Sequence, residues 1–268
     1  MKSIMPIFQR QFQQIQIERT HFLNNPYDPE RTHALRVSLR TLRGLFKFLK
    51  RQLPATSFAT IDQNLSQAAK LLGPLREIDV LIEKSSQYAL KYPSTDTSSN
   101  YYQLFKMFHQ QRQQIMEQVL TTTTQTTLKN CLITVKQQLA QLKFQTELNW
   151  SKLLTQQLKK RQKKIIKAYR HLDLTDYPQV HQIRKKAKTL RYSATYFADF
   201  ISQAAIKTQA AAEKIQDTCG VITDAHVNYG LLQDLAAKIT DPQQKDLLLK
   251  IAHEQEKIYQ PTAKSTDK

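Results

Sequence analysis

One stretch of this sequence carries positive charge at a regular helical spacing. Residues 33–50 contain no proline and a single glycine, so we expect one helix there. Its basic residues follow one another in steps of three and four, and they are His33, Arg36, Arg40, Arg43, Lys47 and Lys50. Because successive helical residues are rotated by about 100°, these side chains share one stripe. Such groups hold anions, and arginine offers two parallel hydrogen bonds to a phosphate.

Apolar residues border this basic stripe on both sides. Leu35 and Leu39 belong to one flank, and Val37 and Phe48 lie on the other. A helix face that only meets solvent does not need apolar residues on both sides of its charges. The pattern therefore favours the wall of a charged groove between packed helices over a solvated basic face.

A second copy of the stripe begins 148 residues further along the chain. The first four basic residues recur in the same spacing as His181, Arg184, Lys188 and Arg191. Lys47 is matched by Thr195, so the second stripe is shorter, although Lys185 adds charge near its start. We expect one end of the shared groove to carry more charge than the other.

A second motif also recurs, at a shift of 147 residues. Residues 72–80 match residues 219–227, and each segment has a glycine followed four residues later by an acid. We expect a helix break at Gly73, where Pro74 follows, and another at Gly220. Two motifs at nearly one offset indicate an internal duplication.

The rest of the chain also reads as helices, because four glycines in 268 residues leave few tight turns. We expect a loop or frayed helix end at the threonine-rich residues 121–127 and a helix start at Asp241 and Pro242. The predicted fold class is all-α, with two four-helix-bundle halves related by a pseudo-two-fold axis around a basic groove or pore. The predicted single domain, 1–268, divides into an N-terminal half at 1–125, a C-terminal half at 126–260 and a disordered tail at 261–268.

Composition narrows the classes of function. Forty Lys and Arg against 22 Asp and Glu leave a net charge of +18, which attracts nucleic acid, anionic lipid or inorganic polyphosphate. The sequence has no run of about 18 apolar residues, so it predicts no membrane span. The N-terminus lacks the pattern of a signal peptide. Cys131 and Cys219 stand far apart, so we expect isolated thiols in a reducing cytoplasm.

Together these residues resemble the CHAD family, an α-helical domain named for its histidines. The resemblance rests on His-x-x-Arg-x-x-x-(Arg/Lys)-x-x-Arg at residues 33–43 and 181–191, and on the break at Leu72 and Gly73. It covers nearly the whole chain, so we expect a stand-alone CHAD protein. It implies an all-helical fold of two four-helix halves, binding of inorganic polyphosphate, and association with polyphosphate granules in the cytoplasm. The second break departs from the pattern, because Cys219 and Thr223 stand where Leu72 and Arg76 stand in the first.

By position, the resemblance assigns two sets of residues to the groove. One side would be lined by His33, Arg36, Arg40, Arg43 and Lys47, and the other by His181, Arg184, Lys188 and Arg191. We add Lys185 to the second set, and Arg76 as either a ligand or a partner of nearby acids. Lys167 lies 148 residues after Arg19, and we expect Lys167 to face inward. Both residues are included as further ligands.

The chemistry of these residues supports the same ligand independently. Polyphosphate has no bases that a protein could recognise. Its binding needs cations at repeated spacing, which a helix stripe supplies about every 5 Å. The alternatives are a metal-dependent enzyme that processes polyphosphate or triphosphate and a non-specific nucleic-acid-binding protein. Glu77, Asp79, Asp217 and Asp224 either hold a metal or cap helices and pair with arginines. The histidines are open as phosphate ligands, core residues or metal ligands.

Each alternative meets an obstacle. A tunnel-type triphosphatase domain carries Glu-x-Glu-x-Lys on a strand, whereas the nearest match here, residues 254–257, has the wrong spacing on a predicted helix. The stripes also lack the interleaved aromatics that stack on nucleic-acid bases. We therefore expect a non-catalytic polyphosphate-binding protein with no cofactor and no membrane partner. Nucleic acid is the less favoured partner, and the oligomeric state is open.

Overall fold

The computed structural model describes residues 3–94, 100–142, 144, 149–201 and 204–260. These residues form ten α-helices and two short 3-10 helices, with no strand among them. The all-α prediction is confirmed. The predicted tail, 261–268, lies outside the described residues. None of the helices within the described ranges is long and apolar enough to cross a lipid bilayer.

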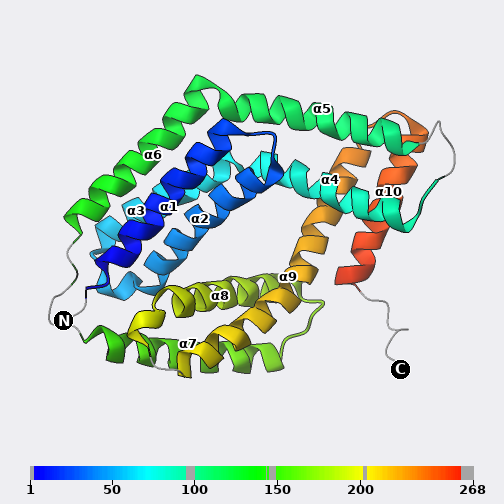
Figure 1. The fold of residues 1–268 in the computed structure, drawn as a ribbon. Coiled ribbons are helices and arrows are strands. Elements are labelled where there is room, and N and C mark those ends of the chain that lie inside the picture. The colour runs from blue at the N-terminus through cyan, green and yellow to red at the C-terminus, as the bar shows by residue number, and fades with distance from the viewer. Residues whose placement is uncertain (1–2, 95–99, 143, 145–148, 202–203, 261–268) are drawn as a thin grey trace.

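The first group of helices contains most of the N-terminal part of the chain (Figure 1). α1 packs on α2, α2 on α3, and α3 on α6, so α6 returns to the helices that began the chain. The bounds of these four helices are α1, Met5–Asn24; α2, Pro29–Phe48; α3, Ala55–Leu71; and α6, Thr122–Gln141.

Two further groups share one long helix, α9 (Ala204–Ala236). Its first part packs on α7 (Trp150–Arg170) and α8 (Tyr177–Tyr196). Its last part runs beside α10, which packs on α5 next to α4 (Figure 1). The remaining elements are α4, Gly73–Lys91; α5, Asn100–Leu120; α10, Pro242–Tyr259; and the 3-10 helices η1, Lys50–Gln52, and η2, Ala198–Phe200.

An aromatic cluster joins the first group to α8. The ring centroids of Phe8 and Phe46 are 4.7 Å apart, and those of Phe48 and Phe197 are 5.9 Å apart. All four rings are almost completely buried. Because Phe197 directly follows α8, this cluster fixes the C-terminal end of α8 against α1 and α2.

Local sequence explains where several helices begin. Asp28 accepts a hydrogen bond from the Glu30 amide, and Pro29 occupies the first turn of α2, where its missing N–H costs nothing. Asp241 caps α10 in the same way, with Pro242 behind it. The predicted helix start at Asp241 is therefore confirmed.

The two predicted glycine breaks have opposite outcomes. α3 ends at Leu71 and α4 begins at Gly73, as predicted. The break at Gly220 is wrong, because α9 continues through it. The residue after the glycine explains the difference. Pro74 has no N–H and its ring clashes with the preceding turn, whereas Val221 continues the helical hydrogen bonding.

The threonine-rich segment also differs from expectation. The prediction of a loop or frayed end over 121–127 is wrong, because α6 begins at Thr122. The Thr121 side chain accepts a hydrogen bond from the Thr124 amide and caps the helix. Threonine is a poor interior residue but a good cap, so one well-placed threonine starts the helix that carries the others. The internal duplication stays a prediction.

Candidate functional site

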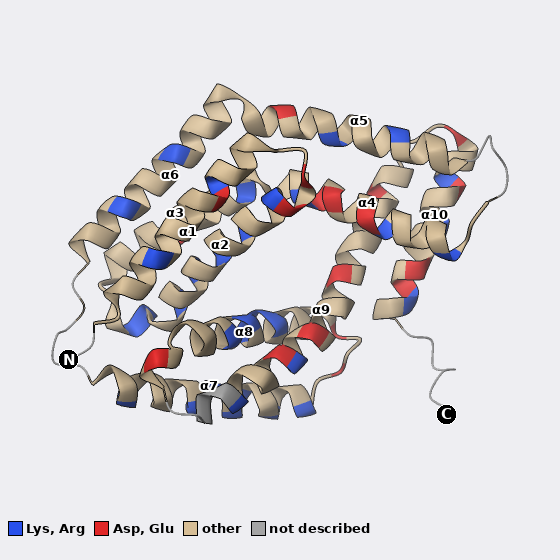
Figure 2. Cartoon of the chain, in the orientation of Figure 1, with Lys and Arg blue, Asp and Glu red and all other residues tan. Residues whose placement is uncertain are grey.

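A basic groove of about 300 Å³ lies between α2, α4, α8 and α9. Figure 2 shows Lys and Arg recurring along α2 and α8, which pack against each other. Six of the basic residues predicted as ligands line the groove. They are His33, Arg36, Arg40, Arg76, Arg184 and Lys188.

The packing of α2 presents its stripe to the groove. Leu35, Leu39 and Leu42 lie on another side of this helix and are fully buried. Where α2 meets α8, Gly44 is buried, and a β-carbon there would lie only 3.9 Å from a ring carbon of Tyr192. At this distance a β-carbon would be in ordinary contact with the ring, so α2 and α8 lie close to each other at Gly44. The two basic faces consequently border one groove.

Positive charge in the groove exceeds the negative charge around it. The lining holds six Lys and Arg but three carboxylates, which belong to Glu77, Glu83 and Asp224. Among the described residues, no carboxylate lies within ion-pair distance of Arg40 or Lys188. The same holds for Arg76. These three cations form no ion pair with a described carboxylate, so the groove attracts an anionic ligand.

Two other groove arginines are fixed by contacts with the protein. Nη1 of Arg36 donates to the carbonyl oxygen of Ala69 at 2.5 Å, and Nη2 of Arg184 donates to Oδ2 of Asp224 at 3.0 Å. A β-carbon added to Gly73 would lie 3.5 Å from Nη1 of Arg36, and one added to Gly220 would lie 3.6 Å from Nε of Arg184. The glycines thus leave room for the guanidinium groups. A duplication would produce this correspondence.

Burial, together with the crowding of cations, lowers several pKa values in the groove. Burial, followed by the charges of Arg40 and Arg184, lowers the pKa of Lys188 to about 7. Burial and the charge of Arg76 lower the pKa of His33. Groups that resist protonation in the empty groove gain protons more readily when an anion is present, because the anion offsets the repulsion.

Three predicted ligands lie outside the groove lining and are paired with acids. Nε of Arg43 donates to Oδ1 of Asp62 at 2.7 Å, and Nη2 donates to Oδ2 at 3.1 Å. Nζ of Lys47 lies 3.5 Å from the same carboxylate, and Arg191 pairs with Glu213 at 2.8 Å. Partial burial raises the pKa of Asp62, but the hydrogen bond and charge of Arg43 outweigh it and lower that pKa. The C-terminal end of the α2 stripe is therefore neutralised more than its start.

The remaining predicted ligands lie elsewhere. His181 stacks on Tyr177, with ring centroids 5.8 Å apart, and burial lowers its pKa. Lys185 lies on another side of α8, in a second basic pocket. Lys167 is exposed on α7, so the expectation that it faces inward is wrong.

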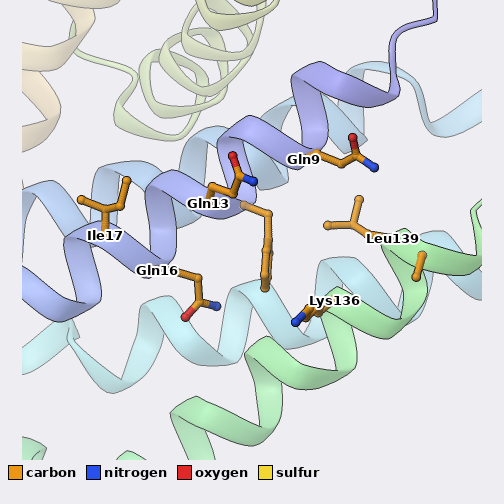
Figure 3. A pocket seen from close by; sticks show the side chains of 8 residues that line it. Gln9, Gln13, Gln16, Ile17, Lys136 and Leu139 are labelled. Carbon is orange, nitrogen blue, oxygen red and sulfur yellow. The ribbon is translucent and has the colours of Figure 1, made fainter.

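Arg19 is on α1, and its Nη2 donates to Oε1 of Gln125 at 3.4 Å. It borders a hollow between α1 and α6, away from the groove. A neighbouring hollow of about 830 Å³ follows the same two helices (Figure 3). Its lining is mostly glutamine and apolar side chains, with Lys136 as its one cation. The first hollow is lined by three cations from α1 and α6, whereas the groove gathers six Lys and Arg from three helices, including both predicted stripes, so the groove is the candidate site. The positions of Arg19 and Lys167 in the structure do not support a ligand role for either residue.

Sequence reasoning left four carboxylates open as metal ligands or as groups that cap helices and pair with arginines, namely Glu77, Asp79, Asp217 and Asp224. Asp224 pairs with Arg184. Asp79 is buried, and its Oδ1 accepts from Nε of Arg112 at 2.6 Å. Within the described ranges, no three His, Cys, Asp or Glu side chains come together in a way that could hold a metal ion. Both cysteines are buried free thiols.

Comparisons with known proteins place this geometry in a family. The chain is similar to the crystal structure of the CHAD domain from the plant Ricinus communis, with a TM-score of 0.71 and 18% sequence identity. That match covers 97% of this chain and 87% of the plant chain. The chain is also similar to PptA from Streptomyces chartreusis, with a TM-score of 0.68 and 11% identity over 96% of this chain and 94% of that one. No curated protein matches the sequence.

At these identities, the two structural matches establish a shared fold. The family model of the CHAD domain matches residues 6–233, which include every lining residue of the groove. The chain therefore belongs to the CHAD domain family.

Proposed function

We propose that the groove binds inorganic polyphosphate and does not cleave it. The observation that carries the proposal is the set of three unpaired cations, Arg40, Arg76 and Lys188, which come from three helices and border one groove. Membership of the CHAD family supports it, because the sequence motifs that define the resemblance contribute most of the basic side chains in the lining. Association with polyphosphate granules would follow from such binding.

The ligand fits the chemistry of the lining. Polyphosphate carries about one negative charge per phosphate at regular spacing, and the first three stripe residues of α2 repeat about every 5 Å along the helix axis. Val37, Val80 and Leu231 also line the groove and displace water from around the cations. With less water between them, the cations and the phosphates attract one another more strongly.

Two of the three lining carboxylates lie within ion-pair distance of cations, which supports binding without cleavage. Hydrolysis assisted by a divalent metal needs carboxylates free to hold the ion beside the phosphate. Here Asp224 pairs with Arg184, and Glu83 lies 3.6 Å from Nζ of Lys84. We accordingly propose that these acids set the positions of cations instead of holding a metal.

Charge reversal in the groove tests binding. The variant Arg40→Glu/Lys188→Glu should lose affinity for long polyphosphate by more than about tenfold, because each lost charge-assisted hydrogen bond is worth about 1.5–3 kcal/mol. Lys160→Glu/Lys163→Glu is the matched control, since both lysines are exposed on α7 and outside the groove lining. Titration at one fixed salt concentration measures the affinities, and circular dichroism checks that the variants are helical.

Unchanged affinity in a folded groove variant would contradict the proposal, as would equal or tighter binding of single-stranded RNA by the unsubstituted protein. A separate assay addresses cleavage. Phosphate release from polyphosphate with Mg²⁺ or Mn²⁺, lost in the groove variant and retained in the control, would show that the site is catalytic.

A further inference from the structure

A second basic pocket, of about 610 Å³, lies between α7 and α8 beside the end of α2. No Asp or Glu is among the residues that line it. Its cations come from all three helices and are Lys47, Arg161, Lys164, Lys185 and Lys186. The pocket therefore concentrates positive charge without an acid in its wall.

This pocket is separate from the groove. On α8, Arg184 and Lys188 line the groove, whereas Lys185, Lys186 and Thr189 line the pocket. At about 100° per residue, these two sets point to different sides of the helix. No residue lines both cavities. The contact between α2 and α8 thus has one basic cavity on each side.

One cation of the pocket is held firmly in place. Nη2 of Arg161 donates to the carbonyl oxygen of Phe48 at 2.6 Å, and its guanidinium carbon lies 4.1 Å from the centre of the Phe48 ring. These contacts leave other N–H groups of this guanidinium free to meet a ligand. An arginine fixed in advance loses little side-chain entropy when an anion binds.

The other cations of the pocket are largely unneutralised. Lys164, Lys185 and Lys186 are exposed, and no described carboxylate forms an ion pair with them. Lys47 shares Asp62 with Arg43 at an Nζ to Oδ1 distance of 3.5 Å. The lysine ammonium groups are flexible point charges that can close around a compact anion.

Apolar side chains form the remainder of the pocket wall. Ile165 and Ile183 are buried and Ala168 lies beside them in the lining. A cavity with clustered cations over an apolar wall suits a ligand with a dense negative group and an uncharged part. The groove differs, because its cations follow one another along a helix.

We propose that this pocket binds a triphosphate group, supplied either by inorganic tripolyphosphate or by a nucleoside triphosphate. The four cations that form no ion pair with a described carboxylate, Arg161, Lys164, Lys185 and Lys186, suit the charge of such a group, and the apolar wall can cover a nucleoside attached to it. The proposal stands independently of polyphosphate binding in the groove, because the two cavities share no lining residue.

Isothermal titration calorimetry with tripolyphosphate and with ATP tests the pocket, in the intact protein and in the groove variant Arg40→Glu/Lys188→Glu. We expect at least one ligand to bind both proteins. Adding Lys164→Glu/Lys186→Glu should weaken that binding by about tenfold or more, since two charge-assisted contacts are lost. The control Lys160→Glu/Lys163→Glu changes the same charge on α7 outside the pocket and should weaken binding less than about twofold.

The two ligands identify the source of the triphosphate. Tighter binding of ATP than of tripolyphosphate indicates a nucleoside triphosphate and a role for the apolar wall, and the reverse order indicates an inorganic ligand. If neither ligand binds, the proposal is overturned. An equal loss of affinity in the pocket variant and its control also overturns it. Failure of the groove proposal would be seen separately. In that case, Arg40→Glu/Lys188→Glu would not weaken the binding of long polyphosphate.

Discussion

Lys188 faces cations from two helices. Arg40 on α2 and Arg184 and Arg191 on α8 repel its charged form, while Asp224 on α9 is the acid that favours it. With its pKa lowered to about 7, Lys188 is about half protonated in the empty groove at neutral pH. A bound polyanion offsets the repulsion and raises this pKa, so the ligand and a proton bind together.

Polyphosphate affinity should accordingly rise as pH falls from 8 to 6, because more of the Lys188 population is charged before the ligand arrives. His33, whose pKa is also lowered, contributes with the same sign. Calorimetry in two buffers of different ionisation enthalpy should report proton uptake on binding near pH 7. Lys188→Arg keeps the charge at every pH in this range and should reduce both effects. Proton uptake of the same size in Lys188→Arg would contradict the assignment to Lys188.

At the scale of the helix, Gly220 combines two roles. It lies in the interior of α9, where glycine weakens a helix, and it leaves space beside Arg184. Its φ is not positive, so its backbone conformation does not require glycine. An added β-carbon would be in ordinary contact with the Arg184 side chain at 3.6 Å.

Gly220→Ala should therefore stabilise the protein by about 0.5–1 kcal/mol, measured by urea unfolding, with polyphosphate affinity almost unchanged. Gly220→Leu has the same gain in helix propensity, but its side chain would occupy the space that the Arg184 guanidinium now uses. It should therefore weaken polyphosphate binding. If Gly220→Leu binds as well as Gly220→Ala, the glycine does not position Arg184.

A buried ion pair joins α4 to α5. Arg112 donates through Nε to Oδ1 of Asp79 at 2.6 Å and through Nη2 to the carbonyl oxygen of Pro26 at 3.2 Å. Both side chains are less than a tenth exposed. The arginine thus fixes the start of α4, and with it Arg76, to α5 and to the turn before α2.

Arg112→Met should lower the free energy of unfolding by about 3–5 kcal/mol, because it leaves the Asp79 carboxylate buried without a partner. Asp79→Leu in the same chain removes the unpaired charge and should recover much of that loss. Urea unfolding of both single variants and the double variant measures the coupling. Additive losses would show that the pair does not act as a unit.

The helices follow closely from sequence, while their interruptions depend on details. Apolar spacing predicts nearly every helix, and Pro74 predicts the end of α3. The predicted break at Gly220 was wrong because glycine by itself only weakens a helix, and the packing of α9 on α8 outweighs that cost. The predicted loop at the start of α6 was wrong for a similar reason, because one capping hydrogen bond at Thr121 offsets the poor helix propensity of the threonines.

For the molecule as a whole, the charge of +18 predicts a strong dependence of polyanion binding on salt. The logarithm of the polyphosphate affinity should fall linearly with the logarithm of the salt concentration, because bound phosphates release counterions. Removing one groove cation, as in Arg40→Gln, should reduce the slope by about 1, whereas Lys163→Gln on α7 should leave it unchanged. Equal slopes in all three proteins would indicate binding by the whole surface instead of the groove.

Sequence periodicity identified the part of the site that lies along single helices. It grouped His33, Arg36 and Arg40 because one helix carries them. It could not show that Arg43 is neutralised by Asp62, since that pair joins two helices whose relative position is set by packing. The pocket on α7 was missed for a related reason. Basic residues surround α7, and only its packing on α8 selects Arg161 and Lys164.

The length of α9 has a consequence for how the protein unfolds. At about 1.5 Å per residue, its 33 residues extend about 50 Å, from the side of α7 and α8 to the side of α5 and α10. Buried residues near both ends, such as Ala212 and Leu232, belong to one continuous core. Neither group of helices can melt without removing a packing surface from the other, so α9 makes the loss of structure cooperative across both.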